Sequence, residues 1–201
     1  IFSLILALCT PLFPYANSLW GHTTSTAFII FALYHLVQRK NINLFFAGFF
    51  IGIAVNCDYM TGVYAVTFTA FAVWRERSKV LFFLAGGLAP LLLFMWYHWI
   101  CFGSPLSLAT LSNNPIFLEQ DKVGGIFGNT SSYIMLQLLF GARRGLLFVS
   151  PVLLFAFAGF YRYIKSMFKV RQWSARELLL WLCLAGILLP LFINASFNGW
   201  H

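Results

Sequence analysis

Long apolar runs, separated by short polar or basic stretches, dominate the chain. The runs are about 15 to 22 residues long, close to the roughly 20 helical residues that cross a 30 Å hydrocarbon layer. Backbone polar groups in lipid must be paired within a helix or a closed barrel, and "VLFFLAGGLAPLLLFMWYHWI" lacks the alternation of a barrel strand. The pattern therefore predicts an all-α fold, a polytopic transmembrane helical bundle.

The composition strengthens this prediction. Apolar residues make up 61% of the chain and charged residues 9%, and the mean hydropathy is +0.82. A soluble domain carries about 25% charged residues, because it must cover its core with a polar surface. We therefore expect a multi-pass protein of the cell membrane, the bacterial inner membrane or its equivalent, in contact with membrane lipids.

The formal net charge of +8 is explained by topology. Three basic clusters separate apolar runs, and under the positive-inside rule they mark cytoplasmic loops. The clusters are Arg39 and Lys40; Arg75, Arg77 and Lys79; and Arg162, Lys165, Lys169, Arg171 and Arg176. A basic face interleaved with aromatic residues does not occur outside these loops, so nucleic acid is not an expected partner.

Alternation of the loops between the two sides predicts one transmembrane domain over residues 1–201, with about six to seven membrane helices. The predicted spans are 1–9, 19–37, 44–55, 63–74, 80–101, 145–161 and 177–193. An outer segment covers 102–144, and its part 131–142 is too apolar for solvent but too short to cross, which predicts an interfacial helix. Because the chain begins without Met and ends after an emerging helix, we expect a piece of a longer protein.

Polar and aromatic residues gather in the turns that this topology places outside. Tyr15, His22, Asp58, Tyr59 and His98 are the candidate substrate-binding residues among them. Each has a structural alternative: a helix cap for the aspartate, interfacial anchoring for the first histidine, and an aromatic belt for the second, which lies in "WYHW". The four cysteines form no CxxC pair, and we expect small buried residues, with a disulfide among the outer ones left open.

Arg143 and Arg144, in "LLFGARRGLLFVSP", lie on the predicted outer side, against the positive-inside tendency. The flanking Gly141 and Gly145 allow another group to approach closely. Planar guanidinium groups match phosphate oxygens, so a bound phosphate-bearing substrate is one interpretation. Anchoring to lipid headgroups is the other.

Four stretches suggest a family. In order along the chain, they are "TPLFPYANSLWGHTTSTAFIIFALYHL", "FFAGFFIGIAVNCDYMTGV", "YHWICFGSPLSLAT" and "LLFGARRGLLFVSPVLLFAFAGF". Together they resemble the membrane-embedded C-type (GT-C) glycosyltransferases, the superfamily of protein O-mannosyltransferases and lipid A aminoarabinose transferases. The resemblance implies an enzyme that transfers a sugar from a polyprenyl-phosphate carrier, outside the cytoplasmic membrane, to a lipid, glycan or protein acceptor.

The resemblance also implies a catalytic acid in a first large outer loop, often as a DxD or DE pair. The chain has no such pair, and its only acids on the outer side are Asp58, Glu119 and Asp121. We therefore expect the catalytic residue upstream of Ile1. A carboxylate would deprotonate the acceptor hydroxyl, and cationic groups would hold the leaving phosphate. No cofactor is expected, and a role for a divalent metal is left open.

Two other classes remain. A transporter or lipid flippase would place paired ionisable residues near the bilayer midplane, whereas the predicted midplanes are apolar, with only Pro90 as an interruption. A non-catalytic membrane homologue would need no outer cavity. The enzyme is the favoured interpretation.

Overall fold

The computed structural model describes residues 2–18, 20–38, 40–75, 77–107, 127–143, 145–167 and 175–196. Over these residues the secondary structure is helical and contains no strand, which confirms the all-α prediction. The chain divides into two compact units. The first comprises Ile1–Thr23 and Thr130–Ala195, and the second comprises Thr24–Asn129 and Ser196–His201.

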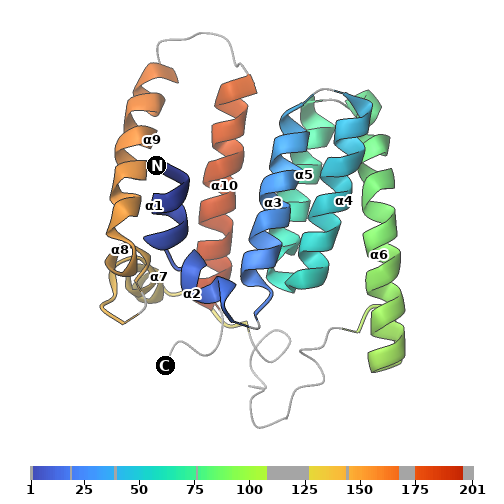
Figure 1. Ribbon diagram of the computed structural model, residues 1–201, viewed down its shortest axis with the longest axis horizontal. Helices are drawn as coiled ribbons and strands as arrows, with labels where there is room; N and C mark the ends of the chain where they lie inside the picture. The colour runs from blue at the N-terminus through green and yellow to red at the C-terminus, as the bar shows by residue number, and fades with distance from the viewer. Residues whose placement is uncertain are drawn as a thin grey trace. The chain divides into compact units, whose positions relative to one another are not determined.

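The second unit is built on four helices that run side by side (Figure 1). They are α3 (His22–Val37, from residue 24 onward), α4 (Asn41–Cys57), α5 (Gly62–Arg75) and α6 (Val80–Phe102). Short 3₁₀ helices, η1 (Tyr59–Thr61) and η2 (Arg77–Lys79), join α4 to α5 and α5 to α6. The four helices coincide with the predicted spans 19–37, 44–55, 63–74 and 80–101. The two short spans, 44–55 and 63–74, extend into their polar turns, as their length suggested.

Amide side chains close the turn between α3 and α4. Asn43 is buried, its Nδ2 donates to Gln38 Oε1 at 2.9 Å, and its Oδ1 lies 3.1 Å from His35 Nδ1. Further from this turn along the two helices, Phe50 of α4 stacks on Phe28 of α3, with ring centroids 6.1 Å apart. The polar residues that predicted a turn here therefore satisfy one another inside it.

Helices α4 and α6 form the most extensive contact of the unit, and glycines make it possible. A Cβ atom on Gly48 would overlap the carbonyl oxygen of Phe83, and a Cβ on Gly86 would overlap the carbonyl oxygen of Phe45. The two backbones thus touch directly, as small residues allow between membrane helices. We call this contact the glycine seam.

Pro90 continues the glycine seam toward the end of α6. A Cβ atom on Gly52 would lie 2.7 Å from Pro90 Cβ, so the ring packs directly on the glycine. Asn56 Nδ2 donates to the carbonyl oxygens of both Gly52 and Pro90, each at 3.0 Å. Helix α6 continues through the proline. The amide therefore links α4 to α6 at the proline.

The first unit contains shorter helices and two longer ones. Its elements are α1 (Phe2–Leu8), α2 (Leu12–Ala16), α7 (Ser132–Phe140), α8 (Leu146–Val149), the 3₁₀ helix η5 (Pro151–Leu153), α9 (Leu154–Met167) and α10 (Ala175–Ser196, of which residue 196 belongs to the second unit). Helices α7 and α8 lie at one end of α9 (Figure 1). With nine residues, α7 is too short to cross a bilayer, as the sequence predicted for 131–142.

The predicted span 145–161 is wrong in one respect: it is not a single helix. Helix α8 ends at Val149, Ser150 takes a non-helical conformation (φ −133°, ψ 72°), and helical structure resumes at Pro151 and continues through α9. Proline lacks the backbone N–H and disfavours the helical conformation of the residue before it. The apolar run therefore continues across a break in the backbone.

Two helices in the described part of the chain are long and apolar enough to cross a membrane. They cover Arg77–Phe102, with η2 included, and Leu179–Ser196 within α10. Helices α3 and α4, of 16 and 17 residues, are apolar but shorter.

Candidate functional site

Asp58 and Tyr59 lie in the turn that follows α4. Asp58 ends the helix with an extended backbone (φ −156°, ψ 114°), and its Oδ1 accepts the N–H of Met60 at 3.0 Å. Its carbonyl oxygen accepts the backbone N–H of Thr61 at 3.0 Å and the Thr61 hydroxyl at 2.7 Å. Asp58 therefore caps η1, the structural alternative that the sequence left open, and its capping fixes the start of the helix that carries Tyr59.

Tyr59 reaches His98, which is fully buried near the end of α6. The Tyr59 hydroxyl lies 3.0 Å from His98 Nε2, and His98 Nδ1 bonds the carbonyl oxygen of Ser107. A carbonyl oxygen only accepts, so Nδ1 carries a proton and Nε2 accepts from the tyrosine hydroxyl. One imidazole thus joins the α4–α5 turn, α6 and Ser107, in the early part of the segment 102–144.

Aromatic rings enclose this histidine. Phe94 stacks on the imidazole with ring centroids 4.0 Å apart, and Phe102 lies at 5.3 Å. By contrast, Trp96 and Trp99 are 63% and 66% exposed. The "WYHW" stretch therefore divides by helical period: the tryptophans face outward, as in an aromatic belt, while the histidine points inward. Sequence reasoning missed this inward role.

Burial raises the pKa of the Tyr59 hydroxyl above its usual range, and the thiol of Cys101 adds a smaller electrostatic contribution. The neutral phenol is therefore the form that the site favours, and it is the form that donates to His98.

In the first unit, the structure brings Tyr15 and His22 together. Their ring centroids are 5.6 Å apart in an edge-to-face arrangement, and Trp20 stacks on His22 at 5.8 Å. Tyr15 and Trp20 are 45% and 66% exposed. The polar and aromatic stretch at residues 15–22 thus forms a small exposed aromatic cluster.

Arg143 lies in the turn between α7 and α8, with its side chain exposed. Gly145 N–H donates to the Gly141 carbonyl at 2.7 Å and closes the turn. A Cβ on Gly145 would meet the Gly141 backbone, and one on Gly141 would lie 2.5 Å from the Gln137 carbonyl oxygen. Both glycines are therefore needed by the turn itself, whereas the sequence suggested that they make room for a ligand. Arg144 lies outside the described residues.

The candidate residues fall into two groups. Asp58, Tyr59 and His98 belong to the second unit, and Tyr15, His22 and Arg143 belong to the first. In the second unit, Tyr59 contacts His98. In the first unit, Tyr15 contacts His22. The two outer acids Glu119 and Asp121 lie outside the described residues.

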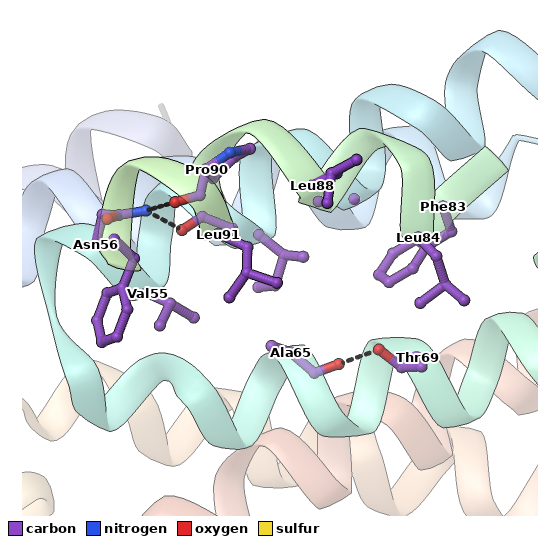
Figure 2. A pocket seen from close by; sticks show the side chains of 14 residues that line it. Val55, Asn56, Ala65, Thr69, Phe83, Leu84, Leu88, Pro90 and Leu91 are labelled. Atoms are coloured by element: carbon purple, nitrogen blue, oxygen red, sulfur yellow. Dashed lines mark hydrogen bonds between the residues drawn. The ribbon is translucent and has the colours of Figure 1, made fainter. Parts of the chain in front are cut away.

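A groove that the sequence did not indicate opens between α5 and α6, with α4 at its base (Figure 2). Its volume is about 490 Å³. Leu84 and Leu91 project from α6 toward α5, where Ala65 and Thr69 face them (Figure 2). Gly48, Gly52 and Gly87 of the close contact between α4 and α6 form part of its lining. In the sequence, the close contact between α4 and α6 is indicated by two glycines four residues apart, Gly48 and Gly52.

Metal and disulfide chemistry find no support over the described ranges. No group of three His, Cys, Asp or Glu side chains there is arranged to hold a metal ion. All four cysteines, Cys9, Cys57, Cys101 and Cys183, are described and free. The disulfide that the sequence left open is therefore not formed in this structure.

Comparison of the chain with protein families, with curated proteins and with solved structures found no match.

Proposed function

We propose that this chain is part of an integral membrane glycosyltransferase, which transfers a sugar from a polyprenyl-phosphate carrier to a lipid, glycan or protein acceptor on the outer side of the cell membrane. The proposal joins the family resemblance of the four sequence stretches to a membrane location. In the 18-residue apolar windows of the two long helices, 17% and 11% of residues are buried. A core helix of a soluble protein would be mostly buried, so lipid is the natural surrounding of these surfaces.

The observation that carries the proposal is the turn at Arg143. An exposed arginine projects there from a tight turn between two apolar helices, on the side where the topology predicts few basic residues. A guanidinium group offers paired donors that fit two phosphate oxygens. In the proposed reaction, Arg143 holds the carrier phosphate and stabilises the negative charge that develops on it as the sugar leaves.

The acceptor hydroxyl must lose a proton as it attacks the anomeric carbon of the sugar, and this step requires a base. Asp58 is a poor candidate, because its Oδ1 accepts the backbone N–H of Met60 in the cap of η1. The proposed base is therefore a carboxylate supplied by another part of the full-length protein. Tyr15 and His22 are proposed to contact substrate on the first unit. On the second unit, this role is proposed for Tyr59, which the buried His98 holds in place.

The test is donor affinity in arginine variants of the full-length protein. Arg143→Ala should weaken binding of a polyprenyl-phosphate sugar by roughly ten- to a hundredfold, because a charge-assisted contact contributes about 1.5 to 3 kcal/mol. Arg143→Lys should restore only part of the affinity, since the charge remains but the planar fork is lost. Arg162→Ala is the matched control, because Arg162 is also exposed but belongs to a predicted cytoplasmic cluster.

Headgroup anchoring gives the opposite pattern. Lys would then substitute fully for Arg143, and Ala would lower membrane insertion or stability while donor affinity stayed unchanged. Unchanged affinity in both Arg143 variants, with correct insertion, would refute the phosphate site.

A membrane homologue without transfer activity is the second candidate. It is favoured by the use of the Asp58 carboxylate as a cap, because this is the only outer acid among the described residues. The two candidates differ in one measurement: the homologue would bind the donor through Arg143 without turning it over.

A further inference from the structure

The groove between α5 and α6 has the dimensions of a lipid chain. We infer that it binds one hydrocarbon chain of an anionic bilayer phospholipid, with the headgroup at the basic end formed by Arg75, Arg77 and Lys79. The inference rests on the membrane location proposed above, but not on sugar transfer, and none of its residues belongs to the Arg143 turn.

The groove offers apolar contact and little hydrogen bonding. Asn56 and Thr69 provide its only side-chain polar groups. Asn56 Nδ2 donates to the carbonyl oxygens of Gly52 and Pro90, and Thr69 Oγ1 donates to the carbonyl oxygen of Ala65 at 2.7 Å. Figure 2 shows the Asn56 and Thr69 side chains at the wall of the groove, with these bonds made to backbone carbonyl oxygens of the helices. A sugar or phosphate placed here would lose its bonds to water without replacement, so an apolar occupant is favoured.

The length of the groove matches one leaflet. Its lining on α6 extends from Phe83 to Phe94, which at 1.5 Å per residue is about 16 Å along the helix axis. One leaflet is half of the roughly 30 Å hydrocarbon layer, or about 15 Å. A chain lying in the groove would therefore run the depth of the leaflet from which it enters.

The shape of the groove suits a hydrocarbon chain. Its volume of about 490 Å³ follows the α6 lining from Phe83 to Phe94, so the space is elongated along the helix. An unbranched hydrocarbon chain is elongated in the same way, and it gains carbon contacts near 4 Å along its whole length.

The charge at one end selects the headgroup. Phe83 and Thr69 mark the end of the groove that leads to η2, and Lys79 precedes Phe83 by one helical turn. The sequence 75–79 carries three basic residues and one acid, Glu76. Arg75 lies over the Phe71 ring, 5.6 Å from its centroid. A basic end beside an apolar groove favours an anionic headgroup over a zwitterionic one.

The experiment is a titration of the purified full-length protein in detergent, with bound lipid counted by native mass spectrometry. We expect one phosphatidylglycerol to bind about tenfold more tightly than phosphatidylcholine with the same chains. Ala65→Phe fills the groove and should lower phosphatidylglycerol affinity about tenfold or more, whereas Ala70→Phe, on an exposed position of α5 outside the groove, should leave it unchanged.

The role of the headgroup is tested with variants in which one basic residue is replaced by glutamine. Arg77→Gln should lower phosphatidylglycerol affinity several-fold while phosphatidylcholine binding stays the same, and Lys40→Gln, in another basic turn, is its control. If Ala65→Phe loses its helical circular dichroism, Leu88→Trp in the groove and Leu93→Trp outside it replace the first pair.

Several results would overturn the inference. They are equal binding of the two lipids, equal effects of the Ala65 and Ala70 variants, and tighter binding of a polyprenyl phosphate than of phosphatidylglycerol in the same groove. Loss of sugar transfer, or failure of the Arg143 test, with lipid binding intact would count against the proposed function alone.

Discussion

Adjacent glycines in α6 provide a sharp test of the glycine seam, because they differ in what a methyl group would meet. A Cβ on Gly86 would overlap the backbone carbonyl of Phe45, whereas a Cβ on Gly87 would lie at an ordinary 3.6 Å from the Gly48 carbonyl oxygen. We expect Gly86→Ala to be less stable than Gly87→Ala, although the two changes are chemically identical and one residue apart.

The size of the difference follows from two opposing terms. Alanine is favoured over glycine inside a helix by about 0.8 to 1 kcal/mol, and this gain applies to both variants. Overpacking costs about 1 to 3 kcal/mol, and it applies only to Gly86→Ala, since the atom in the way is backbone and cannot rotate aside. The two variants should therefore differ in free energy of unfolding by about 1 to 3 kcal/mol, with Gly87→Ala about 0.8 to 1 kcal/mol above the parent.

The assay is reversible unfolding of the purified protein in mixed micelles, followed by circular dichroism. Gly48→Ala should repeat the loss from the α4 side, because its Cβ would overlap the Phe83 carbonyl. Gly159→Ala in α9 has no atom within 4 Å of the added carbon and serves as a control outside the seam. Equal stability of the Gly86 and Gly87 variants would refute the direct backbone contact.

Two further predictions concern the turn after α4. Burial raises the pKa of Tyr59 above its unfolded value of about 10, so its contribution to stability should be full below about pH 10 and lost as the pH rises through the folded-state pKa. Tyr59→Phe should lower stability near neutral pH by about 1 to 3 kcal/mol, because His98 Nε2 loses its donor, and should flatten the alkaline loss. Thermal melts across this pH range measure both effects, and an unchanged alkaline loss in the variant would contradict the assignment. Asp58→Asn should retain the cap to Met60 and most transferase activity, whereas a loss near a thousandfold with normal expression would show that Asp58 is the base.

The helices of the second unit were predictable because their limits are set locally. Basic or amide-rich turns bound each apolar run, so the sequence placed α3 and α6 within a few residues. The break at Ser150 was missed because the apolar run continues unchanged across Pro151. The helical conformation of the backbone, however, is interrupted at Ser150. A proline within an apolar run carried the signal, but Pro90 shows that the same residue can lie in an unbroken helix.

The candidate site was harder to predict, because it depends on how the helices are rotated about their axes. The glycine seam fixes the rotation of α6, and only then does His98 point inward while Trp96 and Trp99 point outward. The contact of His98 with Tyr59 spans 39 residues of sequence. No local pattern records such a pair. The groove also could not be found from the sequence, since it is a space left by close packing elsewhere.

The glycine seam can form only after α6 has been synthesised, because it joins helices that are not consecutive in the sequence. Helix α4 finds its closest neighbour in α6 and not in α5, so it leaves the ribosome before its partner exists. The end of α6 follows the end of α4 by 45 residues, which at roughly 5 to 20 residues per second is a delay of about 2 to 9 seconds. During this interval the glycine face of α4 lies open to whatever surrounds the nascent chain. A pause in translation before residue 80 would prolong that exposure.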